Sequence, residues 1–116
     1  MQQNDSANND NANAVKITNE NFNELINGEQ PVLVDFHAAW CGPCQRIAPM
    51  VEQIVDELHG VALVAKADVD ECPEIAREFN VASVPTFIVF KNGEEVEREV
   101  GVRPRDTLIG LVQQHI

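Results

Sequence analysis

The sequence has no apolar run long enough to cross a bilayer. Its longest runs, such as residues 61–64 and 87–90, are far shorter than the roughly 20 residues that a transmembrane helix needs. Residues 1–14 contain no lysine or arginine and no apolar stretch, whereas signal peptides begin with positive charge and transit peptides are rich in arginine. We therefore expect a soluble cytoplasmic protein without a membrane partner.

Basic residues are also scarce. The chain has 8 lysines and arginines against 19 aspartates and glutamates, which gives a formal net charge of −11. Such a surplus of negative charge repels phosphate backbones, so nucleic acid is not an expected partner. The acidic residues are spread over many segments, a balance that suits either a protein kept soluble at high salt or an ordinary acidic cytosolic protein.

Cysteine is rare as well, with three residues in a chain of 116. A chain of this length can bury a core of useful size without disulfide staples, so we do not expect the cysteines to be scaffolding. Two of the three stand close together in the stretch AWCGPCQ, residues 39–45. Close cysteine pairs in cytoplasmic proteins are mostly catalytic or metal-binding, which makes this stretch the candidate site.

The composition divides the chain into two parts. Residues 1–14, MQQNDSANNDNANA, include five asparagines and lack an apolar pattern, so we expect a disordered polar tail. Residues 15–116 have the mixed composition of one ordinary domain. No internal repeat is visible in them.

Strands are predicted in four places. Residues 32–38 and 61–67 are almost wholly apolar, as is typical of strands covered on both faces. Residues 86–90 and 96–100 flank the pair Asn92-Gly93, which indicates a tight turn of uncertain length between antiparallel strands.

Apolar residues at helical spacing predict four helices. The first covers Phe22 to Ile26 with Thr18 as its cap, and the second has its apolar face from Cys44 to Leu58, with a kink at Pro49. Two more begin at Pro73 and Pro104. Strand, helix and strand in this order imply a parallel unit, so the fold class is α/β, with a mixed sheet between helices.

The cysteine pair has the arrangement of a nucleophile and a resolving thiol. A strand, a turn and a helix in succession place Cys41 at a helix N-terminus, where free N–H groups stabilise a thiolate. Cys44 lies three residues later on the same helical face, within reach of Cys41 and less accessible to a partner. Gly42 would let a partner backbone approach, and Pro43 would stiffen the ring. Half of a zinc site or two structural cysteines are the alternatives, and the lack of a second CxxC argues against a metal.

The motif WCGPC after a buried strand resembles the thioredoxin family. The resemblance covers residues 15–116 and includes VDF before the motif, IAP after it, Val84-Pro85-Thr86, FKNG at residues 90–93, and Gly101. It implies the thioredoxin fold, an α/β fold whose central mixed sheet has helices on both faces. It also implies a thiol-disulfide oxidoreductase, a general protein-disulfide reductase acting by dithiol-disulfide exchange.

The resemblance implies roles for residues outside the motif. Asp35 would be a buried carboxylate behind Cys44, with its pKa raised by burial so that it can act as a general base. Lys66 would lie near Asp35, and a simple ion pair between the two is the alternative role. Pro85 would be a cis-proline facing the disulfide, and Val84 would offer backbone groups to an extended substrate. The remaining members of the implied docking surface are Trp40, Gly42, Pro43, Gly101 and Val102.

The resemblance further implies a monomer that needs no bound cofactor or metal. A thioredoxin reductase drawing on NADPH or ferredoxin would reduce it, and its clients would include ribonucleotide reductase, peroxiredoxins and methionine sulfoxide reductases. Two other functions stay open at this point. One is an oxidant or disulfide isomerase, against which the Gly-Pro dipeptide argues, and the other is a binding role without turnover.

The sequence departs from the family at several positions. His37 stands where many members have a tryptophan, and it either tunes the cysteine pair or is a packed histidine with a satisfied ring. Gln45 replaces a lysine that often follows the motif, and Arg46 partly compensates for that charge. Cys72 is a third thiol near a helix start, either reactive and regulatory or an inert substitute for a polar cap.

Overall fold

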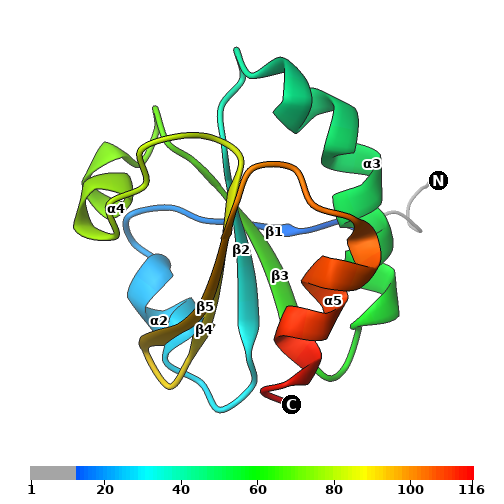
Figure 1. Cartoon of the computed structure of the whole chain (residues 1–116). Coiled ribbons are helices and arrows are strands. Elements are labelled where there is room, and N and C mark those ends of the chain that lie inside the picture. The colour runs from blue at the N-terminus through cyan, green and yellow to red at the C-terminus, as the bar shows by residue number, and fades with distance from the viewer. Residues whose placement is uncertain (1–12) are drawn as a thin grey trace, which may run out of the picture.

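A five-stranded sheet lies between two pairs of helices in the computed structural model, which describes residues 13–116 (Figure 1). The strands are β1 (Val15–Lys16), β2 (Val32–His37), β3 (Leu63–Asp68), β4 (Thr86–Lys91) and β5 (Glu94–Val100). The helices are α2 (Phe22–Ile26), α3 (Gly42–Glu57), α4 (Pro73–Glu78) and α5 (Arg105–Gln113). Of the expected polar tail, residues 1–12 lie outside the described part. Within residues 13–116, no helix has the length and apolar character that a membrane crossing requires.

The strand β2 occupies the centre of the sheet, whose order is β1-β3-β2-β4-β5. It pairs in parallel with β3 on one side and antiparallel with β4 on the other. Helices cover both faces of a central strand of this kind, and this explains its almost continuous apolar sequence. The mixed α/β sheet that was expected from the sequence is therefore confirmed.

Alternation along β2 decides which side chains face the candidate site. Val32, Val34 and Phe36 belong to the core formed with α2 and α4, whereas Leu33 belongs to the core under α3 and α5. Successive side chains of a strand point to opposite faces of the sheet. Asp35 and His37 therefore lie on the α3 side with Leu33, behind the cysteine pair.

Three boundaries differ from the expectations. β1 was not predicted, because a strand of two residues is too short to show alternation. β5 begins at Glu94 rather than Val96, since alternating glutamates on this edge strand hide its period. Asn92 and Gly93 both have positive φ, 54° and 82°, and they form a two-residue turn that closes the β4–β5 hairpin.

Thr18 does not cap α2, contrary to expectation. The residue before this helix is Asn21, and its side chain makes no capping hydrogen bond. Instead, the Thr18 hydroxyl accepts a hydrogen bond from the Asn21 N–H at 3.1 Å, and the Asn21 side chain accepts one from the Thr18 N–H at 2.8 Å. This reciprocal pair fixes the turn that precedes the helix.

Candidate active site

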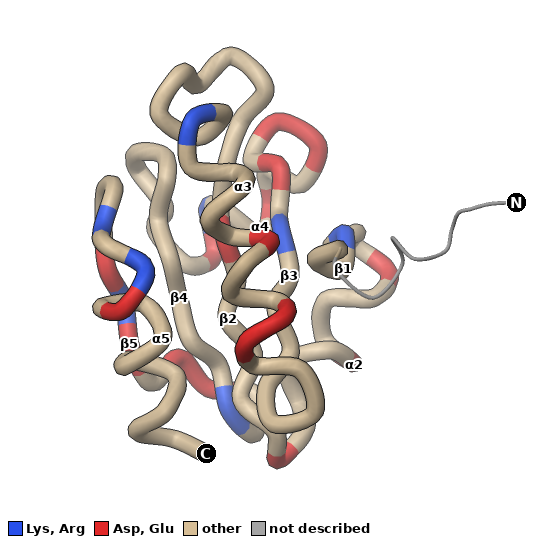
Figure 2. The backbone as a smooth tube through the Cα atoms, turned by 90° about the vertical axis from the view of Figure 1, so that its right-hand side faces the viewer, with Lys and Arg blue, Asp and Glu red and all other residues tan. Residues whose placement is uncertain are grey.

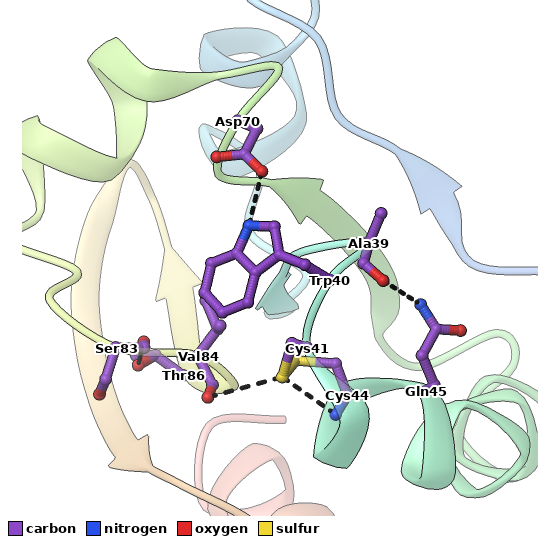
Figure 3. The surroundings of a disulfide bond; sticks show 9 residues. All are labelled: Ala39, Trp40, Cys41, Cys44, Gln45, Asp70, Ser83, Val84 and Thr86. Carbon is purple, nitrogen blue, oxygen red and sulfur yellow. Dashed lines mark hydrogen bonds between the residues drawn. A yellow bond between two sulfur atoms is a disulfide. The ribbon is translucent and has the colours of Figure 1, made fainter.

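Cys41 and Cys44 form a disulfide at the start of α3, with 5.3 Å between their Cα atoms (Figure 3). Cys41 has an extended backbone, with φ −88° and ψ 110°, and it is the N-cap of the helix. The N–H of Cys44 donates a hydrogen bond to the Cys41 sulfur at 3.2 Å. Pro43 sits in the first turn of α3, where its missing N–H costs no helical hydrogen bond. The Cys41 sulfur therefore receives one of the free N–H groups of the helix end, which favours its thiolate form.

Exposure does not rank the two cysteines in the disulfide form. Cys41 is 4% exposed and Cys44 is 6% exposed, so the expectation that Cys44 is the less accessible one is not met. What distinguishes Cys41 is the N–H that its sulfur accepts and its position beside Val84. The Cys41 sulfur lies 3.8 Å from the backbone oxygen of Val84.

A second loop faces the disulfide across this contact. The peptide bond between Val84 and Pro85 is cis, as the family resemblance implied. The Thr86 hydroxyl donates a hydrogen bond to the Ser83 backbone oxygen at 2.7 Å and ties the two ends of the segment together. Gly101, just after β5, donates its N–H to the Pro85 oxygen at 2.8 Å. Three segments distant in sequence thus meet at the disulfide.

The residues expected in the docking surface lie around this meeting point. Gly42 and Pro43 are exposed, Val84 and Gly101 are half-buried, and Pro85 is buried. The exposed large hydrophobic residues include Trp40 and Val102. Exposed apolar groups beside a reactive disulfide are suited to contact with protein partners.

Asp70 belongs to this surface, and sequence reasoning missed it. The indole N–H of Trp40 donates a hydrogen bond to the Asp70 carboxylate at 2.8 Å (Figure 3). Asp70 is held in turn, because its N–H donates to the Asp68 side chain at 2.8 Å. The two partners of the indole bond are 30 residues apart, and no local pattern connects them.

We expect replacement of Asp70 with alanine to free the indole of Trp40. The loss of one charge-assisted hydrogen bond at an exposed site should lower kcat/KM for a disulfide client by about twofold to fivefold. Trp40 is the single tryptophan of the chain, so its fluorescence anisotropy reports the change directly. The matched control is Glu74→Ala, which removes an exposed acid from α4. Unchanged anisotropy in the Asp70 variant would contradict the anchoring role.

The loop before Cys41 has a further tie. The Gln45 side-chain amide donates a hydrogen bond to the Ala39 oxygen at 3.1 Å. At the position where a lysine is common, this chain therefore has a neutral clamp on the loop. The Arg46 guanidinium lies beside Gly42, 3.4 Å from the place a Cβ on that glycine would occupy. Arg46 thus brings a positive charge close to the cysteine pair.

Asp35 is a buried carboxylate on the sheet behind the cysteines. It is 3% exposed, and within residues 13–116 its Oδ1 atom has no hydrogen-bond partner. Desolvation raises the pKa of Asp35 to about 6, although the nearby charge of Lys66 acts in the opposite direction. Asp35 and Lys66 are register partners in β2 and β3, but no salt bridge within 4 Å joins them in the described residues. The simple ion pair considered from the sequence is therefore absent.

His37 is half-buried, and its ring makes no hydrogen bond to another of the described residues. The alternative of a packed histidine with a satisfied ring is therefore not supported. Burial lowers the pKa of His37, and the charge of Lys66 lowers it further, while Asp68 and Glu71 raise it. The imidazole thus favours its neutral form near pH 7.

Cys72 is a buried free thiol that donates to the Ile17 backbone oxygen at 3.6 Å. It precedes α4, but its side chain does not cap the helix. Burial raises the pKa of the Cys72 thiol, and neighbouring acids led by Glu71 raise it further. Both effects oppose formation of the reactive thiolate.

We expect Cys72 to resist thiol reagents in the folded protein. When the disulfide is intact, a chromogenic reagent such as dithionitrobenzoate should detect almost no free thiol in buffer and the Cys72 thiol in urea. Cys72→Ala provides the blank in both conditions. Rapid labelling of the native oxidised protein would contradict the inert role.

Comparison with known proteins gives the same pattern throughout. A family model described as Thioredoxin matches residues 13–114. A thioredoxin from Staphylococcus saprophyticus is 45% identical over 102 residues, which cover 88% of this chain and 97% of that protein. Thioredoxin 1 from Nostoc is 38% identical over 104 residues, with 89% of this chain and 97% of that protein covered.

Solved structures agree with the sequence comparisons. The N21Q mutant of a thioredoxin from Halobacterium salinarum superposes with a TM-score of 0.81 at 34% identity, and the match covers 96% of each chain. A thioredoxin from Malassezia sympodialis also gives a TM-score of 0.81, at 35% identity, with 89% of this chain and 90% of that chain covered.

Proposed function

The chain belongs to the thioredoxin family and is a thiol-disulfide oxidoreductase, and we propose that Cys41 is its nucleophile and Cys44 its resolving thiol. Dithiol-disulfide exchange through this pair makes it a protein-disulfide reductase. The observation that carries the assignment of roles is the hydrogen bond from the Cys44 N–H to the Cys41 sulfur at the N-cap of α3.

The first step is attack by the Cys41 thiolate on one sulfur of a client disulfide. A new bond forms between the two sulfurs, the client disulfide breaks, and its other sulfur leaves as a thiolate that takes a proton from water. The N–H groups at the start of α3 favour the thiolate of Cys41 before the attack.

The second step releases the client. Asp35 takes the proton of the Cys44 thiol, and the resulting thiolate attacks the Cys41 sulfur. The disulfide between Cys41 and Cys44 forms, and the client leaves as a thiolate with both of its sulfurs reduced. The raised pKa of Asp35, about 6, supports this role, because the carboxylate is mostly ionised near pH 7 and basic enough to accept a proton.

The docking surface binds an extended client segment. Val84 offers its backbone to the client beside the Cys41 sulfur, and Trp40 and Val102 provide apolar contact without charge. Contacts of this kind depend little on the client's side chains, which suits a reductase with many clients.

Thioredoxins accept electrons from a reductase and pass them to disulfide clients, generally without a bound cofactor. For this chain we propose a thioredoxin reductase drawing on NADPH or ferredoxin. The proposed clients are ribonucleotide reductase, peroxiredoxins and methionine sulfoxide reductases, in the cytoplasm and with the protein as a monomer. The site itself does not select among these clients.

The reduction potential of the Cys41–Cys44 pair tests the proposed direction of electron flow. We expect equilibrium with a dithiothreitol buffer to give a value close to about −270 mV, which is typical of thioredoxins. The same preparation should reduce the interchain disulfides of insulin when dithiothreitol supplies electrons. A potential near the roughly −120 mV of strong oxidants would instead indicate an oxidase and contradict the proposal.

A further inference from the structure

Asp35 faces a problem that its proposed role creates. If it accepts a proton from Cys44 in each cycle, it must give that proton to solvent before the next cycle, yet it is 3% exposed. The inference below rests on this proposed role of Asp35. The question is which route out of the protein the proton takes.

The register of the sheet defines the neighbours of Asp35 on the α3 face. Along β2 they are Leu33 and His37, and across the sheet they are Lys66 on β3 and Phe87 on β4. Leu33 and Phe87 are apolar and at most 1% exposed, so they block two directions. The remaining two neighbours are polar and half-buried.

Those two polar neighbours, His37 and Lys66, line the same cavity of about 260 Å³. The other residues around it are Ala14, Lys16, Asp68 and Glu71. A polar cavity of this volume has room for several water molecules. Figure 2 shows basic positions on β1 and β3 and acidic positions in the segment that follows β3, where the cavity residues Lys16, Lys66 and Glu71 lie. The cavity therefore connects the polar side of Asp35 with the surface at the β1 edge of the sheet.

His37 is the better carrier of the two. A lysine ammonium has three donors and no acceptor, so it cannot take up a further proton, whereas a neutral imidazole can. The charged groups that surround the ring are Lys16, Lys66, Asp68 and Glu71. The net effect of burial and these charges keeps the ring neutral and ready to accept.

We propose that His37 is a positioning residue for the known reaction, which relays the proton of Asp35 into the water of this cavity. The O–H bond of the Asp35 carboxyl breaks, a ring nitrogen of His37 gains the proton through one water, and the ring then releases it to the cavity. Side chains two residues apart on a strand are separated by about 7 Å, a gap that one water bridges. His37 does not contact the client, and it acts through Asp35.

The test is steady-state reduction of a fluorescent disulfide peptide at saturating client and dithiothreitol. We expect His37→Ala and His37→Gln to lower kcat by about threefold to tenfold, less than the roughly 100-fold that a direct acid-base group contributes. The control is His59→Ala, which removes an exposed imidazole after α3 and should leave kcat unchanged. Added imidazole at constant pH and ionic strength should restore the rate of His37→Ala, because the enlarged cavity admits it.

The Asp35→Asn background separates the relay from the role on which it rests. If His37 acts through Asp35, His37→Ala should have no further effect on kcat in that background. An equal loss in both backgrounds, or a loss that imidazole does not restore, would indicate a structural role and overturn the relay. Wild-type kcat in Asp35→Asn would instead overturn the proposed base. Urea unfolding of both His37 variants shows whether they fold, and His37→Gln keeps a polar side chain of similar size if the alanine variant does not.

Discussion

Cys41→Ser is expected to abolish disulfide reduction. A serine hydroxyl at this position is not ionised near pH 7 and cannot form the mixed disulfide, so the covalent route is lost. Loss of a covalent nucleophile lowers rates by roughly 10⁴-fold or more, and insulin reduction should fall to the rate of dithiothreitol alone. The helix end survives the change, because serine is itself a favoured N-cap residue.

Cys44→Ser should fail in a different way. Cys41 can still attack a client, but no second thiol is present to resolve the mixed disulfide, so the covalent complex accumulates. The measurement is non-reducing electrophoresis after mixing with a disulfide client, followed by dithiothreitol release. Cys72→Ala is the control, because its buried thiol lies outside the proposed reaction. Trapping by Cys41→Ser rather than Cys44→Ser would reverse the proposed roles of the two cysteines.

The elements that position the cysteine pair could be predicted because each has a strong local pattern. The apolar run of β2 (Val32–His37) and the amphipathic face of α3 (Gly42–Glu57) are long enough to show their periods. β1 could not be predicted, since its two residues form a strand only because β3 is already there to pair with them. The length of a strand thus limited the prediction more than its composition did.

The same limit applies to the site. The motif from Cys41 to Cys44 is contiguous in the sequence, and so was visible. The bond between Trp40 and Asp70 joins loops that only the sheet brings together. The cavity beside His37 likewise depends on the pairing of β1 with β3. Contacts between distant segments require the fold before they can be seen.

Asp35→Asn is expected to stabilise the protein at pH 8. The pKa of Asp35 is raised to about 6 in the folded state and is about 3.9 when unfolded, so the folded state holds this proton more tightly. The stability linked to that proton is complete below about pH 4, and it is lost as the pH rises through 6. The loss amounts to about 3 kcal/mol. Asparagine is neutral throughout and avoids this loss.

Urea unfolding at pH 4, 6 and 8 measures the effect. The free energy of unfolding of Asp35→Asn should be close to the wild-type value at pH 4 and exceed it by about 3 kcal/mol at pH 8. Asp106→Asn is the matched control, because it makes the same chemical change at a side chain that is 89% exposed. A constant difference between Asp35→Asn and wild type at every pH would contradict the raised pKa.

The same substitution should slow the enzyme, and the two effects have one cause. The ionised carboxylate is costly because it lies among apolar groups such as Leu33 and Phe87, and that cost is what raises its basicity toward Cys44. Without it, resolution of the mixed disulfide at pH 7 should slow by about 100-fold. The defect should shrink as the pH approaches the ordinary cysteine pKa of about 8.5, where Cys44 ionises unaided. A variant both more stable and equally fast at pH 7 would show that the buried charge has no part in catalysis.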